Sequence, residues 1–120
     1  MITLDQIERA QKNWGEGIIK IGSLKHNYIL CKEFTSSFLN ETYSLENGKI
    51  LFKPTKASEE QFRPNFDMAL SYFIGGKDSF CNEDQGFAMK PWVKVLFENS
   101  GFIFEKNRAI AMGNYFFTDL

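Results

Sequence analysis

Three titratable side chains are the candidates for acid–base catalysis: His26, Asp67 and Asp84. Imidazole titrates at about pH 6.5, so His26 is the natural general base, with a surface or helix-capping histidine as the alternative. Asp67 lies one position off an apolar helical stripe. At the mouth of an aromatic pocket, desolvation would raise the pKa of this carboxyl group and let it act as a base. A favourable charge in the first turn of a helix is the alternative for Asp67.

Asp84 follows Glu83, and such paired carboxylates can act as acid and base or hold a cation. Solvated loop charge is the alternative. Arg63 and Lys90 each precede a proline and are expected to pair with these carboxylates or with an anionic ligand. The chain therefore offers acids, bases and cations, but their mutual distances depend on the fold.

Aromatic residues are the most distinctive part of the composition, with 13 Phe, 4 Tyr and 2 Trp. Aromatic rings with a polar group suit a pocket that is mostly apolar and carries a few placed hydrogen-bond donors. The same rings can also simply fill a core. Under the pocket interpretation, the candidate ligand-binding residues are Trp14, Tyr28, Tyr72, Trp92, Asn114 and Tyr115.

Metal or cofactor chemistry is not expected from this composition. The chain has one histidine and two cysteines, so a zinc site would require His26, Cys31 and Cys81 together. Positions five residues apart on a helix lie about 140° apart around its axis, so His26 and Cys31 would not share a face. We therefore predict no metal ligands and no cofactor, and we expect both thiols to be reduced.

Charge and hydropathy argue against a nucleic-acid-binding protein and against a membrane-spanning one. Fourteen basic and fifteen acidic residues give a net charge of −1, which argues against nucleic acid or an anionic membrane as partner. No apolar run approaches the roughly 20 residues of a membrane span. The sequence begins without a signal-peptide pattern, so the expected location is the cytoplasm. A chain of 120 residues is expected to form a single domain, residues 1–120.

Periodic patterns predict the elements that must position these residues. Helices are expected over residues 4–22, behind a Thr3–Gln6 capping box, and over residues 24–39. The segment 58–73 is also helical in period, but Pro64 divides it into two helices or begins a shorter one. Asn47-Gly48 predicts a hairpin between residues 43–46 and 49–53. Further strands are expected over residues 87–89, 92–98, 102–105 and 108–118, with turns at 99–101 and 106–107. This order predicts an α+β fold, a curved antiparallel sheet packed against about three helices.

The order of elements resembles the nuclear transport factor 2-like superfamily, which includes SnoaL-like cyclases and ketosteroid isomerases. The more specific stretches are residues 51–55, 69–76, 83–88, 91–92 and 112–114. They resemble a bacterial and algal group within that superfamily, part of which is labelled phosphoribosyl-AMP cyclohydrolase. The resemblance implies a cone-like fold with a pocket at its open end. It also implies a last strand and a histidine-bearing C-terminal segment that are absent after Leu120.

Two functions are consistent with these observations. In the first, a lyase- or isomerase-type enzyme holds an apolar small molecule in the cone. In the second, a non-catalytic association module pairs two copies through the sheet. The segment from Arg108 to Thr118 lacks lysine and proline, and such unprotected apolar strands form interfaces or aggregate when they lie at a sheet edge. We therefore predict a homodimer packed through the sheet.

Overall fold

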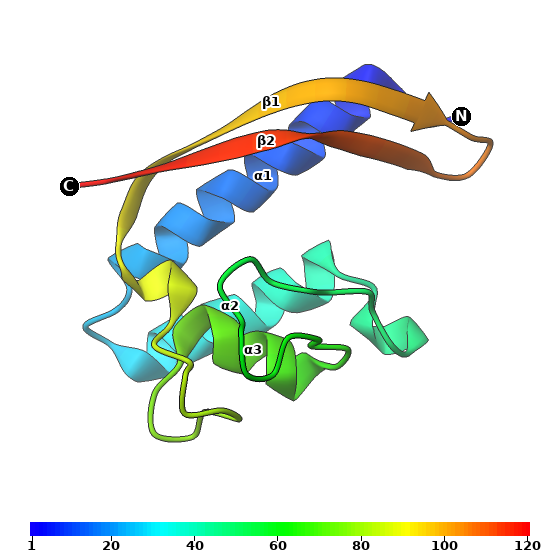
Figure 1. Cartoon of the computed structure of the whole chain (residues 1–120). Helices are drawn as coiled ribbons and strands as arrows, with labels where there is room; N and C mark the ends of the chain where they lie inside the picture. The colour runs from blue at the N-terminus through cyan, green and yellow to red at the C-terminus, as the bar shows by residue number, and fades with distance from the viewer.

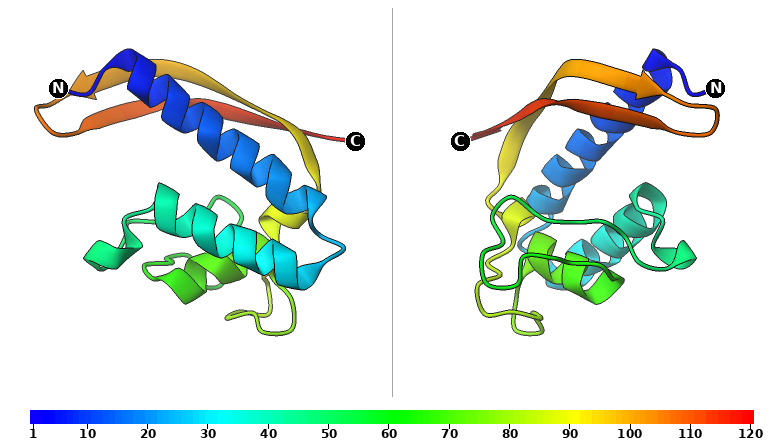
Figure 2. Two further views of the ribbon diagram at one scale, coloured as in Figure 1. Left: turned by 180° about the vertical axis from the view of Figure 1, so that it is seen from behind. Right: turned by 45° about the vertical axis from the view of Figure 1, so that its right-hand side comes forward.

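A long hairpin lies along one helix, and two further helices with extended loops form a second layer below it (Figures 1 and 2). The computed structural model describes the backbone of residues 1–120 and the side chains of all of them except Asn47. The helices are α1 (Leu4–Ser23), α2 (Tyr28–Thr42) and α3 (Phe66–Ile74), with short 3₁₀ helices η1 (Leu45–Asn47) and η2 (Phe87–Met89). The strands are β1 (Trp92–Phe104) and β2 (Ala109–Asp119). The expected α+β class is confirmed, as three helices and a two-stranded antiparallel sheet.

The helix starts follow from side-chain caps. Thr3 and Gln6 form the predicted capping box of α1. The second helix begins later than predicted, at Tyr28, because the Asn27 side chain accepts a hydrogen bond from the Leu30 N–H, while Leu24 caps the end of α1. Asn65 caps α3 in the same way, at the Met68 N–H. The shorter of the two alternatives for the third helix is thus close to the structure.

The prediction of a hairpin at Asn47-Gly48 is wrong. Residues 45–47 form η1, and the chain after Gly48 pairs with a different segment. The Ile50 N–H donates to the Pro64 carbonyl at 3.0 Å, and the Arg63 N–H donates to the Phe52 carbonyl at 2.9 Å. The Phe52 ring then packs against the core, 5.7 Å from the Phe73 ring. Burial of this ring competes with the local turn preference and decides the pairing.

The sheet has fewer strands than predicted. Residues 87–89 form η2 rather than a strand, and the turn predicted at 99–101 is a bulge inside β1. Asn99 pairs with Gly113 and Gly101 with Met112, so one extra residue is absorbed without reversing the chain. The predicted turn at 106–107 is confirmed and joins β1 to β2.

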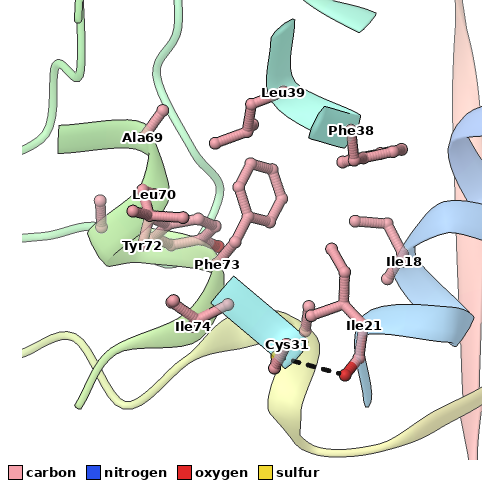
Figure 3. Packing of buried hydrophobic residues seen from close by; sticks show 12 residues of the cluster. Ile18, Ile21, Cys31, Phe38, Leu39, Ala69, Leu70, Tyr72, Phe73 and Ile74 are labelled. Carbon is pink, nitrogen blue, oxygen red and sulfur yellow. Dashed lines mark hydrogen bonds between the residues drawn. The ribbon is translucent and has the colours of Figure 1, made fainter. Parts of the chain in front are cut away.

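The core lies between the C-terminal half of α1 and the two shorter helices (Figure 3). Ile18 and Ile21 of α1 face Cys31 and Phe38 of α2, and the Phe73 ring of α3 fills the space between them. The hairpin contributes little to this core, since most of its apolar side chains are exposed. No helix among the described residues is long and apolar enough to cross a bilayer.

Candidate active site

A pocket of about 460 Å³ lies where three loops meet α3 and the first residue of β1. It is lined by Lys56, Tyr72, Glu83, Asp84, Gln85, Gly86, Phe87, Met89, Lys90 and Trp92. Three of these side chains are aromatic, and four are charged. This mixture of an apolar wall and a few polar groups is typical of a small-molecule site.

Tyr72 places a phenol at the pocket from within α3. Its side chain is only 7% exposed, and its hydroxyl oxygen accepts a hydrogen bond from the Lys56 N–H at 3.2 Å. Burial raises the pKa of Tyr72 to about 12, against the smaller lowering effects of the Lys56 N–H and the Arg63 charge. The phenol is therefore protonated at neutral pH. Among the described residues the phenol makes no hydrogen bond besides the one it accepts, so its hydrogen is free to donate.

Two further rings continue the wall beside Tyr72. Phe87 stacks on Tyr72 with ring centroids 5.5 Å apart and planes 14° apart. Trp92 lies against Phe87 at 5.5 Å, and its indole N–H donates to the Phe87 carbonyl at 2.9 Å. That bond fixes the indole and satisfies its single donor. The wall therefore presents aromatic carbon to the pocket.

Gly86 allows the pocket loop to pass close to α3. Its φ is +86°, and a Cβ at this position would lie 2.8 Å from the Ile74 carbonyl oxygen. Gly75 ends α3 with φ +57°, and its Cβ would meet the Gly86 backbone at the same distance. Only glycine fits two backbones at this separation with positive φ. This contact holds the loop that carries Phe87 against the helix that carries Tyr72.

A buried arginine organises the polar side of the site. Arg63 is fully buried and forms two parallel bonds with Asp84, of 2.8 and 2.9 Å. Two further N–H groups donate to the carbonyls of Glu60 at 2.7 Å and Met68 at 3.1 Å. Ser71 also donates to the Asp84 carboxylate. Asp84 therefore has its oxygens occupied and serves as an anchor for the loops rather than as a free base.

Glu83 is held by backbone groups of the preceding loop. Its carboxylate accepts bonds from the N–H groups of Ser58, Glu59 and Glu60, at 2.9, 2.6 and 3.1 Å, and from the Ser58 hydroxyl at 3.0 Å. These donors, with Ser58 first, lower the pKa of Glu83 to about 2. The carboxylate stays ionised and ties the loops together.

The expected pairing of Arg63 with the two carboxylates is confirmed, since its guanidinium also lies 3.9 Å from Glu83. Lys90 pairs elsewhere, with Asp119 at 3.1 Å, and its amine lies 5.3 Å from the centre of the Trp92 ring. Lys56 is exposed at the pocket. Among the described side chains, no carboxylate lies within ion-pair distance of the Lys56 amine.

The structure brings together three of the candidate residues, Asp84, Tyr72 and Trp92. His26 is exposed in the turn between α1 and α2, away from the pocket. Asp67 is exposed in the first turn of α3 and borders another hollow, which Tyr28 also lines.

The remaining three candidates belong to the sheet side. Trp14 donates its indole N–H to the Tyr43 hydroxyl at 3.0 Å and stacks on Tyr115. The Tyr115 hydroxyl lies 3.0 Å from the Thr55 hydroxyl, one residue before Lys56. Asn114 is exposed on β2, with its amide 3.4 Å from Glu98.

Sequence reasoning missed Lys56 and Gly86. Lys56 lines the pocket and its backbone N–H donates to Tyr72, and a backbone donor leaves no mark in the sequence. A glycine in the sequence can indicate a positive φ, as at Gly86. Nothing in the neighbouring sequence shows which backbone segment this glycine approaches. The Thr55–Tyr115 hydroxyl pair joins residues 60 positions apart, so it had no local signal.

One cluster of potential metal-ligating side chains lies in the described part of the chain. Oxygen and sulfur atoms of Glu59, Cys81 and Glu83 lie within 4.8 Å of one another. Both Glu83 oxygens already accept backbone N–H bonds, and Arg63 stands nearby, so this cluster carries its own counter-charges. The zinc set considered above is not assembled. Cys31 is buried in the core, where desolvation raises the pKa of its thiol.

Comparison with known proteins gives matches to one family, a curated relative and a solved structure. The family described as MICAH, metal-independent carbonic anhydrase, matches residues 5–120. A metal-independent carbonic anhydrase of Nostoc sp. (strain PCC 7120) is 36% identical over 121 residues, which are 98% of this chain and 58% of that protein. The crystal structure of a cyanobacterial iota-carbonic anhydrase complexed with bicarbonate is similar with a TM-score of 0.91 and 35% identity. That match covers 98% of this chain and 73% of the crystallised one.

These matches correct three expectations from the sequence. The assignment to the nuclear transport factor 2-like superfamily, with its SnoaL-like and cyclohydrolase-labelled group, is wrong, because the family match falls elsewhere. The lyase- or isomerase-type enzyme and the non-catalytic association module are wrong as functions for the same reason. Order of elements is a weak identifier, since a small number of folds serve many unrelated activities.

Proposed function

The chain belongs to the metal-independent carbonic anhydrase family, and from this premise we propose that its Tyr72 pocket binds bicarbonate and promotes the reversible hydration of CO₂. The chain spans 58% of the length of its curated relative, so the activity is proposed for this segment on its own residues. The observation that carries the proposal is the Tyr72 phenol, which is buried, protonated and free to donate into an aromatic pocket.

The chemistry requires stabilisation of negative charge on oxygen. When water attacks CO₂, a bond forms between the water oxygen and the CO₂ carbon. One C=O bond of CO₂ becomes a C–O⁻, and one proton leaves to solvent. A donor aimed at the developing oxyanion accelerates such a step when it is fixed before the reaction. Tyr72 is fixed by the Lys56 N–H and by the Phe87 ring. Its hydroxyl donates to the oxygen that becomes negative.

The other groups at the pocket support this role. The Lys56 amine places a positive charge beside the anionic product. The Phe87 and Trp92 rings exclude water from one side, which strengthens the hydrogen bond from the phenol. Arg63 compensates the charge of Asp84, and backbone N–H groups solvate that of Glu83, which reduces the repulsion that these carboxylates exert on bicarbonate.

The decisive experiment is stopped-flow CO₂ hydration with the chain and its Tyr72→Phe variant. Removal of one oxyanion donor is expected to lower kcat by about 10²- to 10³-fold. Tyr28→Phe is the matched control, since this ring lies outside the pocket in the hollow beside Asp67, and its kcat is expected to equal that of the unchanged chain. Equal rates for Tyr72→Phe and the unchanged chain would overturn the role of the phenol. No rate above the buffer background in the unchanged chain would overturn the proposed function.

A further inference from the structure

The Tyr72 pocket is much larger than the molecule it is proposed to turn over. Bicarbonate has four heavy atoms and fills roughly 60–90 Å³, the room of two or three water molecules. The pocket measures about 460 Å³, which lies in the range of sites that hold drug-sized ligands. Most of the pocket volume therefore remains free when bicarbonate is hydrogen-bonded to the groups near Tyr72.

The surplus space has an aromatic wall. Phe87 stacks on Tyr72, and Trp92 is tilted by 42° against Phe87, so the three rings form a continuous surface. The polar atoms of this wall are already satisfied, since the Trp92 indole donates to the Phe87 carbonyl. A flat apolar group gains contact there without the loss of any hydrogen bond.

The polar end of the pocket selects a negative charge. The Tyr72 hydroxyl offers a donor, and the Lys56 amine has no carboxylate partner among the described side chains. The two pocket carboxylates point their oxygens at other groups, Asp84 at Arg63 and Glu83 at backbone N–H groups. A ligand carboxylate at this end meets donors, whereas a ligand cation finds no open acceptor of comparable strength.

We propose that this pocket also binds planar aryl carboxylates, with the carboxylate at Tyr72 and Lys56 and the ring against Phe87 and Trp92. The inference rests on the proposed function in one respect, since it places the carboxylate where bicarbonate binds and so makes the two ligands compete. Recognition of the ring is independent of catalysis. The simplest probe of the class is benzoate.

The first test compares ligands by NMR titration of the ¹⁵N-labelled chain at constant ionic strength. Benzoate is expected to bind with a dissociation constant of about 1 mM, at least tenfold more tightly than acetate, which has the carboxylate but no ring. Benzamide has the same shape without the charge and is expected to bind more weakly than benzoate. Equal affinity for benzoate and acetate would overturn recognition of the ring, and equal affinity for benzoate and benzamide would overturn recognition of the charge.

The two tryptophans give an internal control for the position of the ligand. The Trp92 indole lines the pocket, while the Trp14 indole lies outside it and donates to Tyr43. Benzoate is expected to shift the Trp92 indole signal saturably and to leave the Trp14 signal nearly unchanged, with Trp14→Phe used for assignment. A saturable shift of both signals by the same amount, or of neither, would contradict the proposed site.

A pair of lysine variants tests the orientation of the carboxylate. Lys56→Gln keeps the backbone N–H that Tyr72 requires and removes only the charge. It is expected to weaken the binding of benzoate by about two- to fivefold, the contribution of an exposed ion pair, and to leave the binding of benzamide unchanged. Lys53→Gln, three residues earlier and outside the pocket, is the matched control and is expected to bind benzoate as the unchanged chain does. The same weakening in both variants would overturn the role of Lys56.

The last measurement separates this inference from the proposed function. Benzoate binding with competition by bicarbonate supports both. Benzoate binding in a chain that does not hydrate CO₂ supports the aryl carboxylate site and overturns the proposed function. Catalysis without saturable benzoate binding overturns the aryl carboxylate site and leaves the proposed function standing.

Discussion

The loops around α3 and the β1–β2 hairpin show two ways of holding a chain in place. The loop region has little regular secondary structure, yet its polar groups are bonded, and Arg63 alone reaches Asp84, Glu60 and Met68. Among the described residues, no buried side-chain nitrogen or oxygen lacks a hydrogen-bond partner. The hairpin instead relies on its backbone ladder and on one helix, and it leaves Met112 77% exposed.

The difference shows where precision is required. Directional bonds from a buried guanidinium fix the loops that carry Lys56 and Phe87 relative to Tyr72, so the pocket has a defined shape. The hairpin has a defined register but an open surface, and a surface of this kind is suited to contact with further protein. Substitutions and pH changes in the two regions should therefore have different effects on unfolding.

Removal of the buried guanidinium is expected to have the largest effect. Arg63→Ala leaves Asp84 buried without its partner and should lower the free energy of unfolding by about 3–5 kcal/mol, measured by urea denaturation. The hairpin provides the control, because Arg108 pairs with Glu105 in an exposed turn. Arg108→Ala should cost no more than about 1 kcal/mol. Similar losses in the two variants would show that the loop region does not depend on Arg63.

Alkaline pH is expected to destabilise the loop region through Tyr72. The phenol has a pKa of about 12 in the folded chain and about 10 in the unfolded chain, so the unfolded state loses its proton first as pH rises. The stabilisation is complete below pH 10 and is lost progressively up to pH 12, an effect of about 2–3 kcal/mol.

The free energy of unfolding at a series of pH values measures this loss. Tyr72→Phe should flatten the profile in that interval, although the raised pKa of Tyr43 leaves part of the slope. A slope unchanged by Tyr72→Phe would contradict the assignment.

The hairpin is expected to show the smallest effect on unfolding and a large effect on assembly. The hairpin exposes the apolar side chains of Ile103, Ile110 and Met112, and we predict that this surface lies in a homodimer burying at least about 1,000 Å². Met112→Lys should change the free energy of monomer unfolding by no more than about 0.5 kcal/mol and should dissociate the dimer. Sedimentation at micromolar concentration measures the mass, and a monomeric unchanged chain would refute this prediction.

Local signals in the sequence were sufficient for the start of α1, the end of α3 and the last hairpin turn. The Thr3–Gln6 capping box, the glycine pair after Ile74 and the turn at 106–107 each involve residues a few positions apart. Such signals act on the chain before tertiary contacts form, so they can be interpreted without the fold. The α+β class followed from these elements in order.

Tertiary structure alone decided the pairing of distant segments and the composition of the site. The Asn47-Gly48 turn preference was overridden when Phe52 joined the core, and Ile50 paired with Pro64 instead. The sequence anticipated that Arg63 would pair with Asp84, but only the fold gave Tyr72 its donor from the Lys56 backbone. Composition and spacing identify which groups a chain has. The distances between those groups depend on burial and on long-range contacts, which bring together residues that the sequence keeps far apart.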